Sequence, residues 1–190
     1  MKHLLCRTGS AAACLLLCCL LAGACSRSSV ACSQMRLLTD GAYYPEVRRL
    51  IADAKHSVRV VMFEASYYRK YPSSPSNKLI DALADAAKRG LQVEVILENG
   101  NEDERTTRRN LETARILKSA GAAVFLDPQD ITTHAKMLII DKQTVILGST
   151  NWTYPALTKN HEVAAALHDQ DAAKVLWDYF DGIKKTGKKL

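Results

Sequence analysis

The residue types best suited to phosphate chemistry lie between Thr133 and Glu162. His134 and Lys136 are separated by one residue, and alternate residues of a β-strand share a face, so an imidazole and an ammonium would point to the same side. The apolar residues 137–140 predict that this strand enters a core, and a polar turn at 141–143 predicts a hairpin. The returning strand would carry residues 148–151 towards His134. An ammonium, a hydroxyl and an amide would then meet beside the imidazole, and all three bind phosphate oxygens.

This stretch resembles the signature of the phospholipase D superfamily, H-x-K-x4-D-x6-G-S-x-N. Every specified position is present: His134, Lys136, Asp141, Gly148, Ser149 and Asn151. The resemblance implies that the histidine attacks phosphorus and forms a phosphohistidine, while the lysine and the asparagine bind the non-bridging oxygens. We expect the serine to donate a supporting hydrogen bond and the glycine to permit close backbone approach. Asp141 lies seven residues beyond His134, so we interpret it as structural, bracing the turn.

A nucleophilic imidazole must be held in one tautomer, usually by a carboxylate. The segment Asn160-His161-Glu162 resembles a downstream Asn-x-Glu element of the same superfamily, in which the glutamate orients the histidine. Glu162 is therefore the predicted partner of His134.

The mechanism of the family needs a second motif histidine, which protonates the leaving oxygen and then activates water, but this sequence contains a single H-x-K. A homodimer with two motifs facing each other across a two-fold axis would supply it. Around residues 151–160 the expected interface is apolar, with Trp152, Tyr154, Pro155 and Leu157. Packing of these residues inside the monomer is the alternative.

Other histidines are weaker candidates for this acid. His161 alternates with Glu162 on an expected strand and should face the opposite side. His56 and His168 lie at the ends of expected elements, where a solvated surface histidine is the simpler interpretation.

The resemblance implies a phosphodiesterase without a metal or another cofactor, and the residues from Ser33 onward contain no cysteine for a zinc site. The compact single-motif layout, similar to that of small bacterial endonucleases, favours an endonuclease acting on DNA or RNA. A phospholipase D acting on membrane phospholipids is the second candidate, and a non-catalytic phosphate-binding module is the third. The net charge of +6 suits an anionic partner without choosing between nucleic acid and lipid.

The polar loop at 66–77 is a candidate substrate surface. Tyr67, Tyr68, Arg69 and Lys70 are an aromatic and basic group of the kind that stacks bases and holds phosphates. A plain exposed loop is an equal alternative.

Positioning these groups requires an α/β domain, which we expect over residues 41–188. Helical spacing follows Pro45 and recurs at 79–87, 111–117 and 170–180, whereas β-rich runs occupy 58–63, 91–97, 122–126 and 162–167. The order βαβαβ, followed by a hairpin, a strand and a helix, predicts a mixed β-sheet flanked by helices on both faces, as in the phospholipase D-like α/β/α sandwich.

The amino-terminal segment resembles an export signal. Residues 1–24 combine Lys2 and Arg7 with an apolar run and a small-residue site at 22–24, and Cys25 follows directly. Lipidation at Cys25, plain cleavage and an uncleaved anchor are the three interpretations, and all place the domain outside the cytoplasm or at a membrane. Residues 25–40 are serine-rich and are expected to be a tether.

Overall fold

The computed structural model describes residues 34–100 and 104–190, and all of them belong to one compact unit, Cys32–Leu190. The predicted signal at 1–24, Cys25 and the first part of the predicted tether lie outside the described residues. Within the described ranges, no helix combines the length and the apolar composition that crossing a bilayer requires.

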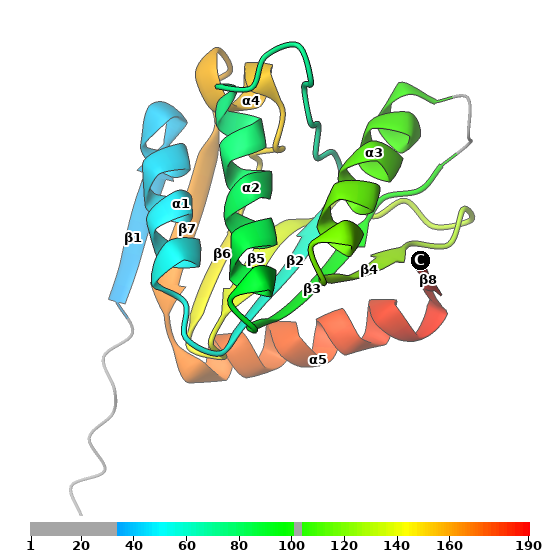
Figure 1. Cartoon of the computed structure of the whole chain (residues 1–190). Helices are drawn as coiled ribbons and strands as arrows, with labels where there is room; N and C mark the ends of the chain where they lie inside the picture. The colour runs from blue at the N-terminus through cyan, green and yellow to red at the C-terminus, as the bar shows by residue number, and fades with distance from the viewer. Residues whose placement is uncertain (1–33, 101–103) are drawn as a thin grey trace, which may run out of the picture. The chain divides into compact units, whose positions relative to one another are not determined.

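The centre of this unit is an eight-stranded sheet with the order β1-β7-β6-β5-β2-β3-β4-β8 (Figure 1). Strands β2, β3 and β4 are parallel, and the remaining pairs are antiparallel, so the predicted mixed sheet is confirmed. The bounds of the strands are β1 (Gln34–Thr39), β2 (Ser57–Met62), β3 (Gln92–Leu97), β4 (Ala123–Leu126), β5 (Lys136–Ile140), β6 (Thr144–Gly148), β7 (Val163–His168) and β8 (Lys188–Lys189).

Helices cover both faces of the sheet, as the sequence predicted (Figure 1). Their bounds are η1 (Asp40–Ala42), α1 (Tyr43–Asp53), α2 (Pro75–Lys88), α3 (Arg105–Ser119), α4 (Tyr154–Thr158) and α5 (Gln170–Thr186). Helices α1, α2 and α3 share one buried apolar cluster with alternate strand residues such as Val60 and Leu138. The other parity of the strands, including Val61 and Ile139, packs with α5. The period-two alternation of buried side chains on both faces explains why the central strands read as continuous apolar runs.

The predicted domain boundary at residue 41 differs from the structure. Residues 34–39 form β1, which pairs along its full length with β7, so this part of the predicted tether belongs to the sheet. The strand escaped the sequence because only Leu38 is buried in it, which leaves a mostly exposed edge strand without a clear apolar pattern. Helix α3 also begins six residues before the first apolar residue that indicated it, because the residues of its first turn are all polar.

Two residues expected at a subunit interface are instead inside the domain. Trp152 and Leu157 are buried, and the indole of Trp152 donates a hydrogen bond of 3.1 Å to the hydroxyl of Tyr43. Their apolar character is therefore explained by the monomer core.

The predicted site residues gather at one end of the strands of the sheet. Met62, which ends β2, pairs with Lys136 at the start of β5. Gly148, which ends β6, pairs with Ala164 near the start of β7. The hairpin of β5 and β6 therefore returns the chain to the end of the sheet at which β5 began.

Candidate active site

His134 lies in the loop immediately before β5, and its imidazole is supported by an aromatic ring. The ring centroids of His134 and Phe63 are 4.8 Å apart. The ammonium of Lys136 lies over the same Phe63 ring, 4.9 Å from its centroid. Strand β5 starts at Lys136, so the two motif residues are not alternate residues of one strand as predicted, yet Phe63 brings both side chains to one place.

Lys136 is a buried cation, 7% exposed. Its ammonium donates a hydrogen bond of 2.6 Å to the main-chain oxygen of His134. Within 34–100 and 104–190 it forms no ion pair with a carboxylate. Burial lowers the pKa of Lys136 from its usual range, and the nearby charge of Glu162 partly opposes this. An ammonium has three donors, so this one has capacity left for an anionic substrate.

The main chain before His134 is fixed by two buried carboxylates. The N–H of Thr133 donates to Glu98, and the hydroxyl of Thr133 donates to Asp127. Burial raises the pKa of each of these carboxyl groups. The loop that presents the imidazole is thus tied to the ends of β3 and β4.

Ser149 and Glu162 form a direct contact across the ends of β6 and β7. The hydroxyl of Ser149 donates to the carboxylate of Glu162, which also accepts a hydrogen bond of 3.1 Å from the amide of Asn160. Gly148 precedes this pair, and a Cβ atom there would lie 2.4 Å from the main-chain oxygen of Val163. The absence of a side chain at Gly148 therefore permits the close approach of β6 to β7 that brings Ser149 to Glu162.

Glu162 is also held by Asp40, a residue that the sequence analysis did not single out. The N–H of Asp40 donates to the main-chain oxygen of Glu162 at 2.9 Å, and the N–H of Glu162 donates to the Asp40 carboxylate at 2.8 Å. Asp40 has a positive φ of 46°, which aspartate tolerates better than most residues. The Asp40-Gly41 dipeptide is a turn signal that could have indicated its position but not its partner.

Asn151 lies in the wall of a cleft of about 1010 Å³ beside these residues. Its side-chain oxygen is buried and lacks a hydrogen-bond partner among the described residues. A buried polar atom without a partner is uncommon. This oxygen can only accept a hydrogen bond, so the phosphate-binding role expected of Asn151 would fall to its NH2 group.

Asp141 lies at the opposite end of the strands, in the turn between β5 and β6. Its carboxylate accepts hydrogen bonds from the N–H groups of Lys55, His56 and Ser57 at 2.8–2.9 Å. Burial alone would raise the pKa of Asp141, but the three backbone donors lower it overall. Asp141 thus joins the β5–β6 turn to the start of β2 and does not contact His134.

A family comparison agrees with this arrangement. The cardiolipin synthase, PLD-like domain matches residues 47–184, which include every motif position. The chain belongs to the phospholipase D superfamily. Its sequence is similar to a phospholipase D of Rickettsia bellii, with 32% identity over 125 residues that cover 66% of this chain and 57% of that protein. The chain therefore spans little more than half the length of this relative.

Two solved structures share the fold of this phospholipase D-like domain. Nuc from Salmonella typhimurium, a phospholipase D family member, superposes with a TM-score of 0.71 and 22% identity, covering 83% of this chain and 98% of that one. NucT from Helicobacter pylori has a TM-score of 0.66 and 18% identity, with coverage of 83% and 99%. Nearly the whole length of both proteins is thus matched by this fold.

The predicted substrate loop is divided by the structure. Lys70 lines the cleft beside Asn151. Arg69 instead forms an ion pair with Glu112 on α3, and Tyr67 interacts with Asp81 on α2. Neither Arg69 nor Tyr67 lines the cleft. The sequence analysis could not predict this, because the direction of a loop side chain does not follow from its position in the sequence.

The remaining described histidines are not brought to His134 by any hydrogen bond or ring contact. His161 is fully exposed and lies 3.5 Å from the carboxylate of Asp40. His56 and His168 lie at the far ends of β2 and β7, and His168 contacts Thr144.

Among the described residues, no group of three or more His, Cys, Asp or Glu side chains is placed to hold a metal ion. Metal independence stays a prediction of the sequence. The residues that the sequence missed, Phe63 and Glu64, directly follow the buried strand β2, and strand ends are where α/β domains commonly bind ligands.

Proposed function

We propose that this phospholipase D superfamily domain is a phosphodiesterase that works through a phosphohistidine on His134, and that its substrate is nucleic acid. The observation that carries the proposal is the buried ammonium of Lys136, which lies beside His134 and has no carboxylate partner among the described residues. A desolvated cation without a direct ion-pair partner favours an anion, and a phosphodiester supplies one.

The reaction divides into two displacements. In the first, a ring nitrogen of His134 forms a bond to phosphorus as the bond to the leaving oxygen breaks, and a second imidazole gives that oxygen its proton. In the second, the same imidazole takes a proton from water, the water oxygen bonds to phosphorus, and the bond to His134 breaks. Lys136 and Asn151 would stabilise the charge on the non-bridging oxygens in both steps.

The second imidazole would come from another copy of the chain. His161 lies near the carboxylate of Asp40, and His56 and His168 lie at the far ends of β2 and β7. A two-fold axis beside the site would place the His134 of each subunit on opposite sides of one phosphorus.

An exposed apolar strip supports this dimer. Met35, Leu37, Leu147 and Val163 are each between 43% and 65% exposed. Leu37 pairs with Ala165, which pairs with Leu147, so the strip crosses β1, β7 and β6 on one face of the sheet. Leu147 and Val163 adjoin Gly148 and Glu162. A second copy that covered this strip would therefore lie next to the site, whereas the interface predicted around Trp152 and Leu157 would not form.

Nucleic acid is favoured over phospholipid because the compact single-motif layout resembles that of small bacterial endonucleases. A phospholipase D acting on lipid headgroups is the alternative, since the motif recognises the phosphodiester and not its substituents. The sequence pattern of residues 1–25 further leads us to propose export to the periplasm or to a membrane.

One parallel assay tests the proposal. The full chain is incubated with single-stranded DNA, RNA, plasmid DNA and phosphatidylcholine vesicles, each with and without excess EDTA. We expect cleavage of nucleic acid that EDTA does not abolish, because Lys136 supplies positive charge at the phosphate. Release of headgroup with intact nucleic acid would replace the nuclease by a lipase, and activity restored to an EDTA-treated enzyme only by a divalent metal would overturn metal independence.

A further inference from the structure

The cleft beside Asn151 has walls of an unusual composition. Three tyrosines, Tyr68, Tyr71 and Tyr154, line its volume of about 1010 Å³. Three cationic residues line it as well: Lys70, Arg105 and Arg109. The rings come from two separate segments, the loop after β2 and the start of α4, so their convergence is a property of the fold.

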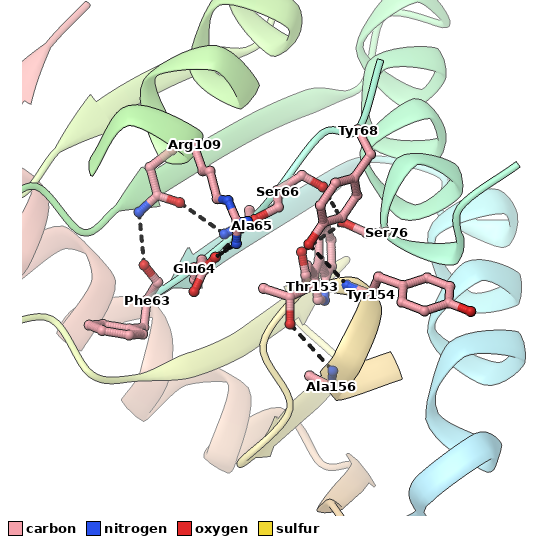
Figure 2. Close-up of polar contacts among 12 residues, drawn as sticks. Phe63, Glu64, Ala65, Ser66, Tyr68, Ser76, Arg109, Thr153, Tyr154 and Ala156 are labelled. Atoms are coloured by element: carbon pink, nitrogen blue, oxygen red, sulfur yellow. Dashed lines mark hydrogen bonds and ion pairs between the residues drawn. The ribbon is translucent and has the colours of Figure 1, made fainter. Parts of the chain in front are cut away.

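Two of these rings are presented to solvent. Tyr71 is 68% exposed and Tyr154 is 44% exposed. Figure 2 shows where Tyr68 meets the start of α4: its hydroxyl accepts a hydrogen bond of 3.3 Å from the N–H of Tyr154. Aromatic rings that face an open cleft have their stacking surfaces available to a ligand.

The loop that carries Tyr68 and Tyr71 is fixed in place. The fully buried Asn77 accepts from the N–H of Tyr68 at 2.8 Å and donates to the main-chain oxygens of Tyr68 and Tyr71 at 3.1 and 3.2 Å. The hydroxyl of Ser76 donates to the main-chain oxygen of Trp152 at 2.7 Å, which ties the loop to the segment after the motif. The main chain of the loop is therefore held in position before any ligand arrives, and this reduces the entropy lost on binding.

The charge of the cleft suits a polyanion. Figure 2 shows Arg109 directed at Glu64, and the two side chains are 2.6 Å apart. Glu64 is buried and its charge is compensated by this pair, while the guanidinium also lies 5.6 Å from the ring of Tyr68. Lys70 and Arg105 then leave the lining with a positive excess.

Building on the proposed function, we infer that this cleft is a subsite for single-stranded nucleic acid, with unpaired bases stacked on Tyr71 and Tyr154 and phosphates held by Lys70 and Arg105. Stacking on aromatic rings beside a basic groove is how proteins bind single strands, and it needs bases that are free of a partner strand. Asn151 belongs both to the lining of the cleft and to the motif, so a strand bound in the cleft would contact one of the motif residues. The volume lies at the upper end of the range of about 300–1,000 Å³ that is usual for ligand pockets, which is enough room for one or two nucleotides.

The test is direct binding, measured separately from catalysis. The full chain carrying His134→Asn is titrated into a fluorescein-labelled DNA single strand, the matched duplex, the matched RNA single strand, and phosphatidylglycerol vesicles. In the cleft, Tyr71→Ala and Tyr154→Ala are compared singly and combined in one variant. The control is Tyr179→Ala, which removes an exposed tyrosine on α5 across the sheet. Because all three rings are exposed, circular dichroism should show unchanged folds.

We expect tighter binding of a single strand than of the duplex, and a loss of at least about fivefold in affinity for each ring removed. Tyr179→Ala should leave the affinity unchanged. Lys70→Gln and Arg105→Gln should each reduce the slope of log affinity against log salt by about one. The DNA and RNA arms identify which polymer is preferred.

Several results would overturn the inference: no oligonucleotide binding, equal affinity for duplex, or unchanged affinity in the tyrosine variant. A loss of vesicle binding in place of oligonucleotide binding would assign the cleft to lipid. A failure of the proposed function gives a different result. If binding depends on Tyr71 and Tyr154 but the wild-type chain hydrolyses no nucleic acid, the subsite is supported and the proposed catalytic activity is contradicted.

Discussion

Asp40 and Glu162 exchange two hydrogen bonds, one from each main-chain N–H, at 2.9 and 2.8 Å. Residues far apart in sequence are thereby joined at the end of the sheet that carries the candidate site. Asp40 directly follows β1, so the edge strand positions the glutamate that contacts Ser149. This makes Asp40 a positioning residue in the proposed mechanism.

Replacement of Asp40 tests this role without confusing it with backbone strain. Asp40→Gly keeps the positive φ accessible and removes the acceptor, so we expect kcat to fall about 2- to 12-fold, the equivalent of one hydrogen bond. Asp40→Asn retains an acceptor oxygen and tolerates the same φ, so it should restore most of kcat. Equal kcat values for Asp40→Gly and the wild type would show that the pair does not support catalysis.

The interaction between Glu162 and Lys136 predicts a shift in the pH profile. Lys136 must be protonated to bind phosphate, and the charge of Glu162 raises its pKa against the effect of burial. Glu162→Gln removes that charge, so the pKa of Lys136 falls and the alkaline limb of kcat moves to lower pH. Glu112→Gln, which breaks an exposed pair with Arg69, is the control and should leave the limb in place. An alkaline limb that does not move in Glu162→Gln would show that the charge of Glu162 does not influence the protonation of Lys136.

Asp141 predicts a loss of stability with a defined pH dependence. Its lowered pKa means that it stabilises the fold above the ordinary aspartate pKa of about 3.9, and that this contribution is lost as the pH falls through the lowered value. Asp141→Asn leaves backbone donors unsatisfied, so the free energy of unfolding should fall by about 1–3 kcal/mol at neutral pH. The difference from wild type should narrow below about pH 4.

The measurement is urea unfolding monitored by circular dichroism across this pH range. Asp53→Asn, which removes an exposed ion pair with Arg49, is the matched control and should cost less than about 1 kcal/mol. Equal losses in the two variants would contradict the bracing role of Asp141.

The proposed dimer depends on the apolar strip at β1, β7 and β6. Leu37→Lys places a charge in that strip, so sedimentation should show a monomer and activity should fall with the loss of the second His134. Arg36→Gln changes the neighbouring residue, which points to the other face of β1, and should leave both properties intact. A wild-type chain that is monomeric and fully active at nanomolar concentration would remove the composite site.

The local part of the site was readable from the sequence because a hairpin fixes it. The turn at 141–143 determines the register of β5 against β6, and this register returns Ser149 and Asn151 to the end where His134 lies. The fold class followed from periodicity for a similar reason, since the buried strands alternate with amphipathic helices.

Contacts across the chain were not readable in this way. The partner of Asp40 lies on the strand that pairs with β1, and β1 itself lacks an apolar pattern. Trp152 was assigned to an interface because its partner in the core, Tyr43, is remote in sequence. In the loop at 66–77, Asn77 sets the main chain, and only the resulting conformation directs Tyr71 towards the cleft while Tyr67 faces Asp81. Each of these depends on tertiary packing, which no local pattern encodes.

The central claim is that His134 forms the covalent bond to phosphorus, and trapping that bond is its most direct test. The full chain is mixed with bis(p-nitrophenyl) phosphate, denatured at alkaline pH where a phosphorus–nitrogen bond survives, and mapped by peptide mass spectrometry. We predict an adduct on the peptide containing His134 that appears with turnover, and the loss of both adduct and turnover in a folded His134→Asn variant. An adduct on a different residue, or sustained hydrolysis by His134→Asn, would contradict the account.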